Sequence, residues 1–258
     1  MKKLLIVVLL MIAVGAAVVG YGLNNAGAII KQQVERQGSR FFDTQVSLAN
    51  ADLAVSEGRL TLTGLTVANP PGFSANTALA IDAITIDLQG SASEPYVLQA
   101  FSVIAPTVLY ESNATGGSNL LALKQAISKH LPRGQTSPSS ETGPAPTVIV
   151  DNITIVDTAL TLDLSALATE QFGVTNANYA MTLPTISVAG IGQPNGIPAN
   201  QVGAAIADAM LNEIIQVAKR EAKETLKDKA KEKYNEEINK QKDKLKEKAK
   251  QKIKGLFG

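Results

Sequence analysis

Residues that could carry out chemistry are sparse in this 258-residue chain. It contains one histidine, His130, and no cysteine, so disulfides, zinc–thiolate sites and cysteine nucleophiles are excluded. No serine lies in a G-x-S-x-G turn, and neither a phosphate-binding loop nor a dinucleotide fingerprint is present. We therefore expect a protein that is not an enzyme and uses no cofactor or metal, with His130 at the surface beside a loop.

Five aspartates are the other candidates for metal binding or acid–base work. They fall within runs of alternating apolar residues, mostly at the positions between the apolar ones, and alternate residues of a strand point to opposite faces of a sheet. This spacing favours solvent-facing charges over a converging cluster. The five are Asp82, Asp87, Asp151, Asp157 and Asp163.

Residues 58–73, GRLTLTGLTVANPPGF, show the structural pattern that dominates the chain. Leu60 and Leu62 alternate with polar residues, which predicts a strand with one apolar face. At Gly64 the apolar positions change from even to odd numbers, and glycine tolerates the β-bulge that such a slip predicts. The sequence NPPG then ends the strand, because proline offers no backbone donor and glycine permits a turn.

The same pattern, an alternating apolar run that changes phase near its middle, recurs along the chain. Together these runs predict long, strongly twisted antiparallel strands with one apolar side, and no sequence feature protects the edges of such a sheet. The fold class that we expect is α+β and β-rich, with a curved or groove-like sheet. The further runs occupy residues 79–88, 101–110, 148–164 and 181–188.

An uncharged apolar stretch begins with Leu4 and ends with Leu23, directly after Lys2 and Lys3. Its length suits a transmembrane helix, and the lysines place the N-terminus in the cytoplasm. A cleaved secretory signal is the alternative. We expect residues 1–23 to form a short cytoplasmic stub and an anchor, and residues 24–44 to form a juxtamembrane helix that serves as a connector.

The remaining segments fall into a β-rich domain at 45–198 and a C-terminal helix at 199–258. Within the domain, helical spacing of leucines predicts a short helix over 118–131, which Ser118 or Asn119 can cap. Residues 132–147 are rich in Pro, Ser, Gly and Thr, so we expect a mobile loop. The last helix is amphipathic up to Ala218 and rich in Lys and Glu beyond it.

Charge is distributed unevenly along the chain. Residues 219–254 hold 15 basic and 8 acidic residues, a net charge of +7, whereas the rest of the chain carries a net charge of −6. A basic segment favours anionic partners such as lipid headgroups or nucleic acid. The apolar N-terminal stretch argues for lipid.

Four segments together resemble the AsmA-like family of envelope proteins of Gram-negative bacteria. They are GRLTLTGLTVANPPGF, LAIDAITIDL, FSVIAPTVLYE and GGSNLLAL, and the resemblance covers roughly residues 1–190 of what would be a short member. It implies an inner-membrane protein with a single membrane pass and a periplasmic β-rich groove tied to lipid binding or transport and to outer-membrane upkeep.

The apolar strand faces have two interpretations. One is an ordinary core sealed by the helix over 199–218. The other, which the resemblance implies, is an open groove that binds acyl chains of phospholipid or another envelope lipid. The groove candidates are Leu60, Leu62, Leu65, Val67, Ile84, Ile86, Leu88, Val103, Ile153, Ile155, Leu162, Ile186 and Val188.

The basic C-terminal helix has three interpretations: a solvated helix, an element that docks on an anionic membrane, or a coiled coil with a protein partner. A structural or assembly-assisting envelope protein that acts through this helix is our alternative to lipid binding. The membrane-docking candidates are Lys246, Lys248, Lys250, Lys252, Lys254, Leu256 and Phe257.

Overall fold

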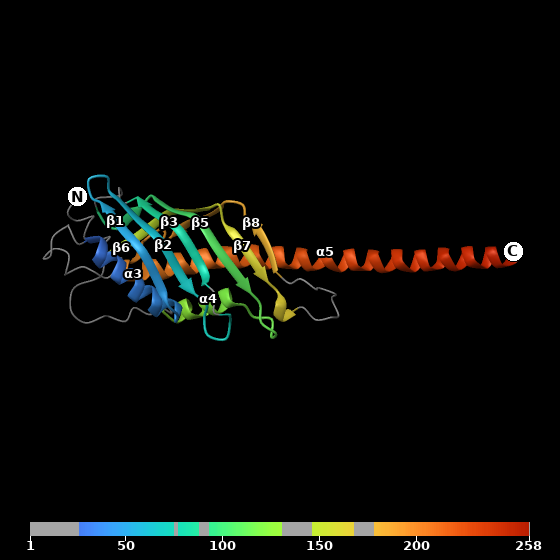
Figure 1. Ribbon diagram of the computed structural model, residues 1–258. Helices are drawn as coiled ribbons and strands as arrows, with labels where there is room; N and C mark the ends of the chain where they lie inside the picture. Colours follow the sequence, from blue (N-terminus) through green and yellow to red (C-terminus); the bar gives the residue numbers. More distant parts are fainter. Residues whose placement is uncertain (1–25, 75–76, 88–92, 131–145, 168–177, 258) are drawn as a thin grey trace.

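The computed structural model describes residues 26–74, 77–87, 93–130, 146–167 and 178–257, which form one sheet with helices packed against it (Figure 1). The helices are α3 (Ala26–Phe42), α4 (Asn119–His130) and α5 (Ala199–Phe257), with a 3₁₀ turn η2 (Ser165–Leu167). The strands are β1 (Val46–Ala54), β2 (Arg59–Ala68), β3 (Thr77–Asp87), β4 (Tyr96–Leu98), β5 (Ala100–Glu111), β6 (Thr147–Val156), β7 (Ala159–Asp163), β8 (Asn178–Thr182), β9 (Ile186–Ile191) and β10 (Ile197–Pro198).

Helix α3 lies within the range 24–44 where we expected a helix, and α5 begins at the expected residue, Ala199. The expected anchor over 4–23 and most of the expected loop over 132–147 lie outside the described residues. Among the helices that the structure describes, none combines the length and the apolar character needed to cross a membrane.

The sheet is mixed, so the expectation of a wholly antiparallel sheet was wrong. Its ten strands follow the order β1-β2-β3-β5-β6-β10, with β4, β7, β8 and β9 off this path. Strands β6 and β7 run parallel to β5, with Phe101 opposite Ile153 and Val108 opposite Leu160. The connection after β5 carries α4, and a crossover of this length returns the chain to the end where β5 began, as parallel pairing requires.

The phase changes in the sequence line up as one row across the sheet. In β2, Leu60 and Leu62 are buried before Gly64, and Val67 is buried after it. The register with β3 is nevertheless continuous across Gly64, from Leu62–Ile84 to Leu65–Ile81. The bulge that we expected at Gly64 is therefore absent, and the register shift between β2 and β3 falls at Val67/Ala68 instead.

The register survives because neighbouring strands change phase at the same level. The pairings place Gly64 opposite Asp82, Asp82 opposite Ala105, and Ala105 opposite Asp157. Gly64, Ala105 and Asp157 have positive φ values of 66°, 48° and 56°. Such a residue rotates the chain, so the side chains that follow it return to the face covered by the helices.

Helix α3 covers the free edge of β1. Three of its side chains, spaced by four residues, bond the outward backbone groups of that strand: Ser39 Oγ accepts from Val46 N (2.9 Å), Glu35 Oε1 accepts from Leu48 N (2.9 Å), and Lys31 Nζ donates to Ala49 O (3.2 Å). Exposed strand edges invite pairing with other chains. This edge is thus protected, and α3 is more than the connector that we expected.

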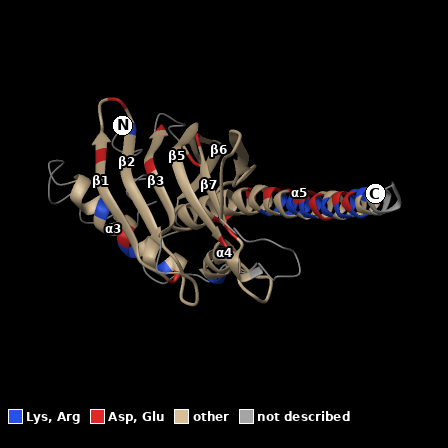
Figure 2. Cartoon of the chain, turned by 45° about the vertical axis from the view of Figure 1, so that its right-hand side comes forward, with Lys and Arg blue, Asp and Glu red and all other residues tan. Residues whose placement is uncertain are grey.

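Helix α5 has two parts. Up to Leu226 it packs on the sheet and on α4, with Val202, Ile214 and Ala222 among its buried residues. Beyond that point, residues 227–257 extend past the sheet as a helix about 46 Å long at 1.5 Å per residue (Figure 1). We call this second part the arm. Figure 2 shows that its surface alternates between basic and acidic side chains.

Candidate functional site

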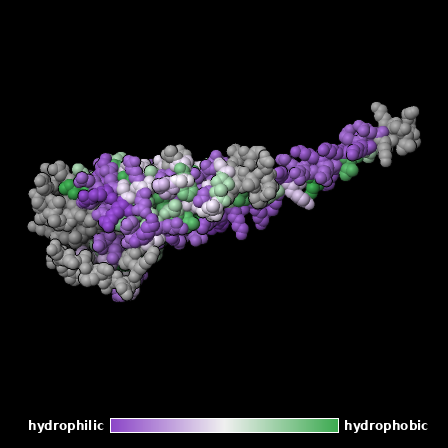
Figure 3. Space-filling model, turned by 90° about the horizontal axis from the view of Figure 1, so that it is seen from below, coloured by the Kyte–Doolittle hydropathy of each residue, from purple (hydrophilic) through white to green (hydrophobic). Residues whose placement is uncertain are grey.

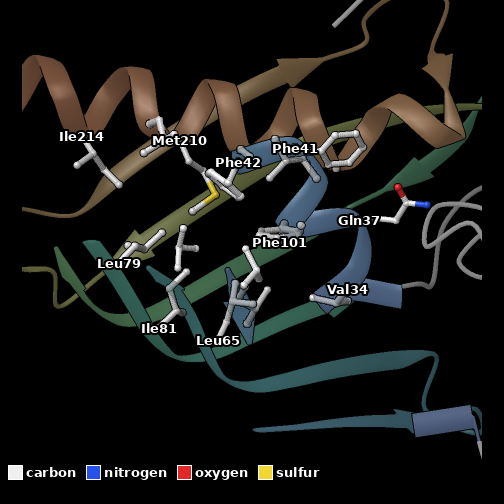
Figure 4. Close-up of a pocket in the computed structure, with 18 of the residues that line it drawn as sticks. Val34, Gln37, Phe41, Phe42, Leu65, Leu79, Ile81, Phe101, Met210 and Ile214 are labelled. Carbon is white, nitrogen blue, oxygen red and sulfur yellow. The ribbon is translucent and has the colours of Figure 1, made fainter. Parts of the chain in front are cut away.

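An apolar pocket lies between the sheet, α3 and the packed part of α5 (Figure 4). Its volume is about 210 Å³. The lining residues come from α3, β1, β2, β3, β5 and α5, and Figure 4 shows apolar side chains such as Phe42, Leu65 and Met210 pointing toward one another around the pocket. The lining residues are Gln33, Val34, Gln37, Gly38, Phe41, Phe42, Val46, Leu65, Val67, Leu79, Ile81, Ile84, Phe101, Gly203, Ile206, Ala207, Met210, Leu211 and Ile214.

No charged side chain lines this pocket, and only Gln33 and Gln37 contribute polar side chains. In Figure 4 the Gln37 amide points away from the cavity. Three of the chain's six phenylalanines line the pocket: Phe41 and Phe42 on α3, and Phe101 on β5. Because an ionised group would be desolvated here without a partner, the inner pocket suits an uncharged, apolar occupant.

Helix α3 is held in place at the end that contributes the phenylalanines. Directly after Phe42, the Asp43 carboxylate accepts a 2.8 Å hydrogen bond from Lys129 Nζ at the end of α4. This bond, together with the nearby charges of Lys129 and His130, lowers the pKa of Asp43 below its ordinary value. The His130 ring also lies 5.8 Å from the Phe41 ring, centre to centre. The contacts tie the wall of the pocket to α4.

Helix α5 supplies the opposite wall with residues at helical spacing. Ile206, Met210 and Ile214 recur every four residues and are buried. One turn earlier is Gly203, which is exposed, and a Cβ built on it meets no atom within 4 Å. The pocket wall therefore contains a position where a side chain could enter open space.

Only three of the expected groove residues line this pocket: Leu65, Val67 and Ile84. The others form the core beneath the helices, except that Val188 is only partly buried and Leu88 lies outside the described residues. The sheet face over which we expected a long groove is thus largely covered by helices. The buried core residues are Leu60, Leu62, Ile86, Val103, Ile153, Ile155, Leu162 and Ile186.

Sequence reasoning did not select the pocket residues on α3 and α5. A usable signal existed, since Val34, Phe41 and Phe42 stand out as the apolar positions of α3. The sequence did not reveal where α3 lies over the sheet.

A second cluster of side chains is polar and at least partly buried, and it holds the NPPG turn after β2. Asn119 is 0% exposed, and its Nδ2 donates to Asn69 Oδ1 and to Leu109 O, both at 2.8 Å. Its Oδ1 accepts from Glu111 N (2.9 Å) and Leu120 N (2.8 Å).

The Glu111 carboxylate completes this polar cluster. It accepts hydrogen bonds from Asn69 Nδ2 (2.8 Å) and from the backbone and hydroxyl of Ser74. These groups satisfy one another's hydrogen-bonding capacity, so we interpret the cluster as a structural feature that fixes the turn in place. We call it the lock. Ser118, whose Oγ accepts from Leu121 N, caps α4, which leaves Asn119 for the lock.

The residues first considered for chemistry do not come together. Asp82, Asp151 and Asp157 are exposed and lie apart on the sheet, and the Asp163 carboxylate accepts from the Ser165 backbone and hydroxyl. His130 ends α4 with a 26% exposed side chain, so it is more buried than expected. Across the described ranges no three His, Asp or Glu residues are grouped to hold a metal ion.

The membrane-docking candidates lie on the arm. Lys246, Lys248 and Lys250 are exposed there, and Lys250 Nζ is 3.8 Å from the Glu247 carboxylate. Figure 3 shows the arm as mostly hydrophilic with a few hydrophobic patches. The side chains of Lys252, Lys254, Leu256 and Phe257 lie outside the described residues, although α5 continues to Phe257.

No family model matches the chain, and neither the curated proteins nor the solved structures contain a protein that matches it.

Proposed function

We propose that this protein binds the apolar chain of a lipid, without catalysis, in the pocket between α3, α5 and the sheet. The observation that carries the proposal is a preformed cavity of about 210 Å³ that no charged residue lines. Ligand sites are commonly apolar clefts with a few polar groups at their rim. The glutamines Gln33 and Gln37 fit that rim role.

The size of the cavity narrows the ligand. An engineered apolar cavity of about 150 Å³ is enough to bind benzene, and drug-sized ligands occupy roughly 300–1,000 Å³. A cavity of about 210 Å³ therefore suits one stretch of acyl chain, with the headgroup outside the pocket. A whole two-tailed phospholipid would require the helices to move apart.

The cellular setting belongs to the same proposal. The apolar stretch over 4–23 and the resemblance of the strand segments to AsmA-like proteins support a place at the bacterial inner membrane, with the sheet in the periplasm. There the protein would handle envelope lipids and support envelope integrity.

The test uses the full chain and a fatty acid that carries a diazirine on its tail. After irradiation, the crosslinked peptides are identified by mass spectrometry, which separates adducts in the pocket from adducts in residues 1–25. The informative variant is Gly203→Leu, because the new side chain enters open space at the pocket wall. The matched control is Gln216→Leu, which adds the same side chain at an exposed position of α5 outside the pocket.

We expect adducts within 33–42 and 203–214 that excess unlabelled fatty acid competes away. Gly203→Leu should reduce them several-fold, whereas Gln216→Leu should leave them unchanged. Adducts that Gly203→Leu does not reduce, or an absence of adducts in both segments, would refute the pocket proposal. The covered sheet would then be a closed core, and the alternative of an assembly-assisting envelope protein would be favoured.

A further inference from the structure

The arm presents two stripes of opposite character with identical spacing. Tyr234, Ile238, Leu245 and Ala249 are separated by four, seven and four residues, so they lie on one side of a helix with 3.6 residues per turn. Tyr234 is 66% exposed and Leu245 is 67% exposed. We call these four residues the apolar stripe.

The acidic stripe repeats the same spacing two residues earlier. Its members are Glu232, Glu236, Asp243 and Glu247, each two positions before a member of the apolar stripe. Two residues correspond to a rotation of about 200° on an α-helix. The acidic side chains therefore lie on the side of the arm opposite to the apolar stripe.

Lysines flank the apolar stripe on both sides. Lys242 precedes Leu245 by three residues and Lys248 follows it by three, which places them about 60° to either side. Lys246 lies on the same side as Lys242, and all three are exposed. Residues 240–254 hold eight lysines and two acidic residues, a net charge of +6.

We propose that the arm lies along an anionic lipid surface, with the apolar stripe facing the lipid, the flanking lysines at the headgroups and the acidic stripe turned to water. This is the arrangement of an interfacial amphipathic helix. The arm carries the proposal independently of the apolar pocket, because it lies beyond the end of the sheet and shares no residue with the pocket (Figure 1).

Two other partners fit the arm less well. In a coiled coil of two copies, facing apolar stripes would bring the flanking lysines of both copies together, whereas coiled coils place opposite charges beside their seam. Nucleic acid would match the positive charge of the arm, but it would leave the exposed side chains of Tyr234 and Leu245 without an apolar surface to contact. The arm also contains no arginine, the residue best suited to bidentate phosphate recognition.

The experiment measures the environment of the arm in the full chain with a fluorescent dye. Because the chain has no cysteine, Ala249→Cys provides a single labelling site for an environment-sensitive dye on the apolar stripe. Glu247→Cys provides the matched site on the acidic stripe. The labelled chain is held in phosphatidylcholine nanodiscs and titrated with vesicles of equal parts phosphatidylglycerol and phosphatidylcholine. The same chain is also reconstituted in nanodiscs of that mixed composition.

We expect a blue shift for dye at position 249, a smaller one at 247, and reversal by high salt. Neutralising the two lysines nearest the apolar stripe (Lys242→Gln and Lys248→Gln) should weaken binding at least about tenfold, since each lysine near an anionic surface contributes about fivefold. The same change at Lys240 and Lys250, which lie toward the acidic stripe, should weaken binding less.

Three results would overturn the proposal. The first is no dye response to the mixed lipid, either in the vesicle titration or in the mixed-lipid nanodiscs, or an equal response to pure phosphatidylcholine. The second is an equal loss of binding from both lysine pairs, which would mean that the apolar stripe is not the side that faces the lipid. The third is a dye response that depends on protein concentration without anionic lipid, or that arises with duplex DNA alone, which would point to a second copy or to nucleic acid.

Discussion

Replacing Asn119 with alanine tests the lock that holds the turn after β2. Its carboxamide makes four hydrogen bonds of 2.8–2.9 Å in a place where the residue is 0% exposed. Asn119→Ala removes all four and leaves two donors and two acceptors behind.

The expected cost follows from those partners. A net value of about 1 kcal/mol for each intramolecular hydrogen bond gives roughly 4 kcal/mol. Leu109 O and Glu111 N can relax slightly, so we expect a loss of about 3–4 kcal/mol in the free energy of unfolding. That is a large share of the roughly 5–15 kcal/mol that stabilises a typical domain.

Urea unfolding of the full chain, followed by circular dichroism, measures this loss. Asn119→Asp keeps the acceptor toward Glu111 N and Leu120 N but turns an oxygen toward Asn69 Oδ1, so it should also be strongly destabilised at neutral pH. Asn152→Ala is the control, because that exposed side chain makes a single bond to Thr154 and should change stability by less than about 0.5 kcal/mol. An effect below about 1 kcal/mol for Asn119→Ala would refute the reasoning.

Three further changes probe the pocket walls. Gly38→Leu should destabilise the protein by about 1–3 kcal/mol and speed hydrogen exchange in α3, because a Cβ at this position already lies 3.0 Å from Val46 Cγ1. Hydrogen exchange as slow as in the unaltered chain would contradict this packing. Met210→Ala should cost about 2–5 kcal/mol in urea unfolding and enlarge the pocket, and a smaller cost would mean that the wall collapses. Asp43→Asn should lower the melting temperature by its full amount above about pH 4 and progressively less as the pH falls through the folded pKa, since a carboxyl whose pKa is lowered on folding stabilises the folded state while it is ionised. A difference between Asp43→Asn and the unaltered chain that persists at lower pH would argue against the ion pair with Lys129.

Local periodicity determined the elements of this protein. Leu60 and Leu62 alternate with polar residues, a pattern that indicates a strand, and the four-residue spacing of Val202, Ile206 and Met210 indicates a helix. The phase change at Gly64 was also visible in the sequence. Its meaning was not, because a bulge in one strand and a shared row of phase changes leave the same pattern in any single strand.

Only the tertiary structure decided how these elements combine. Side chains alternate between the two faces of a sheet in parallel and antiparallel pairs alike, so the alternation in β6 did not reveal that it runs parallel to β5. Periodicity likewise indicates that one face of an element is buried, but it does not indicate which other element covers that face. The pocket joins Phe41, Phe101 and Met210 from three distant segments, and its existence depends on how closely α3 and α5 approach the sheet. The arm is the opposite case: it makes few contacts with the rest of the fold, so its stripes follow from the sequence and the helical period alone.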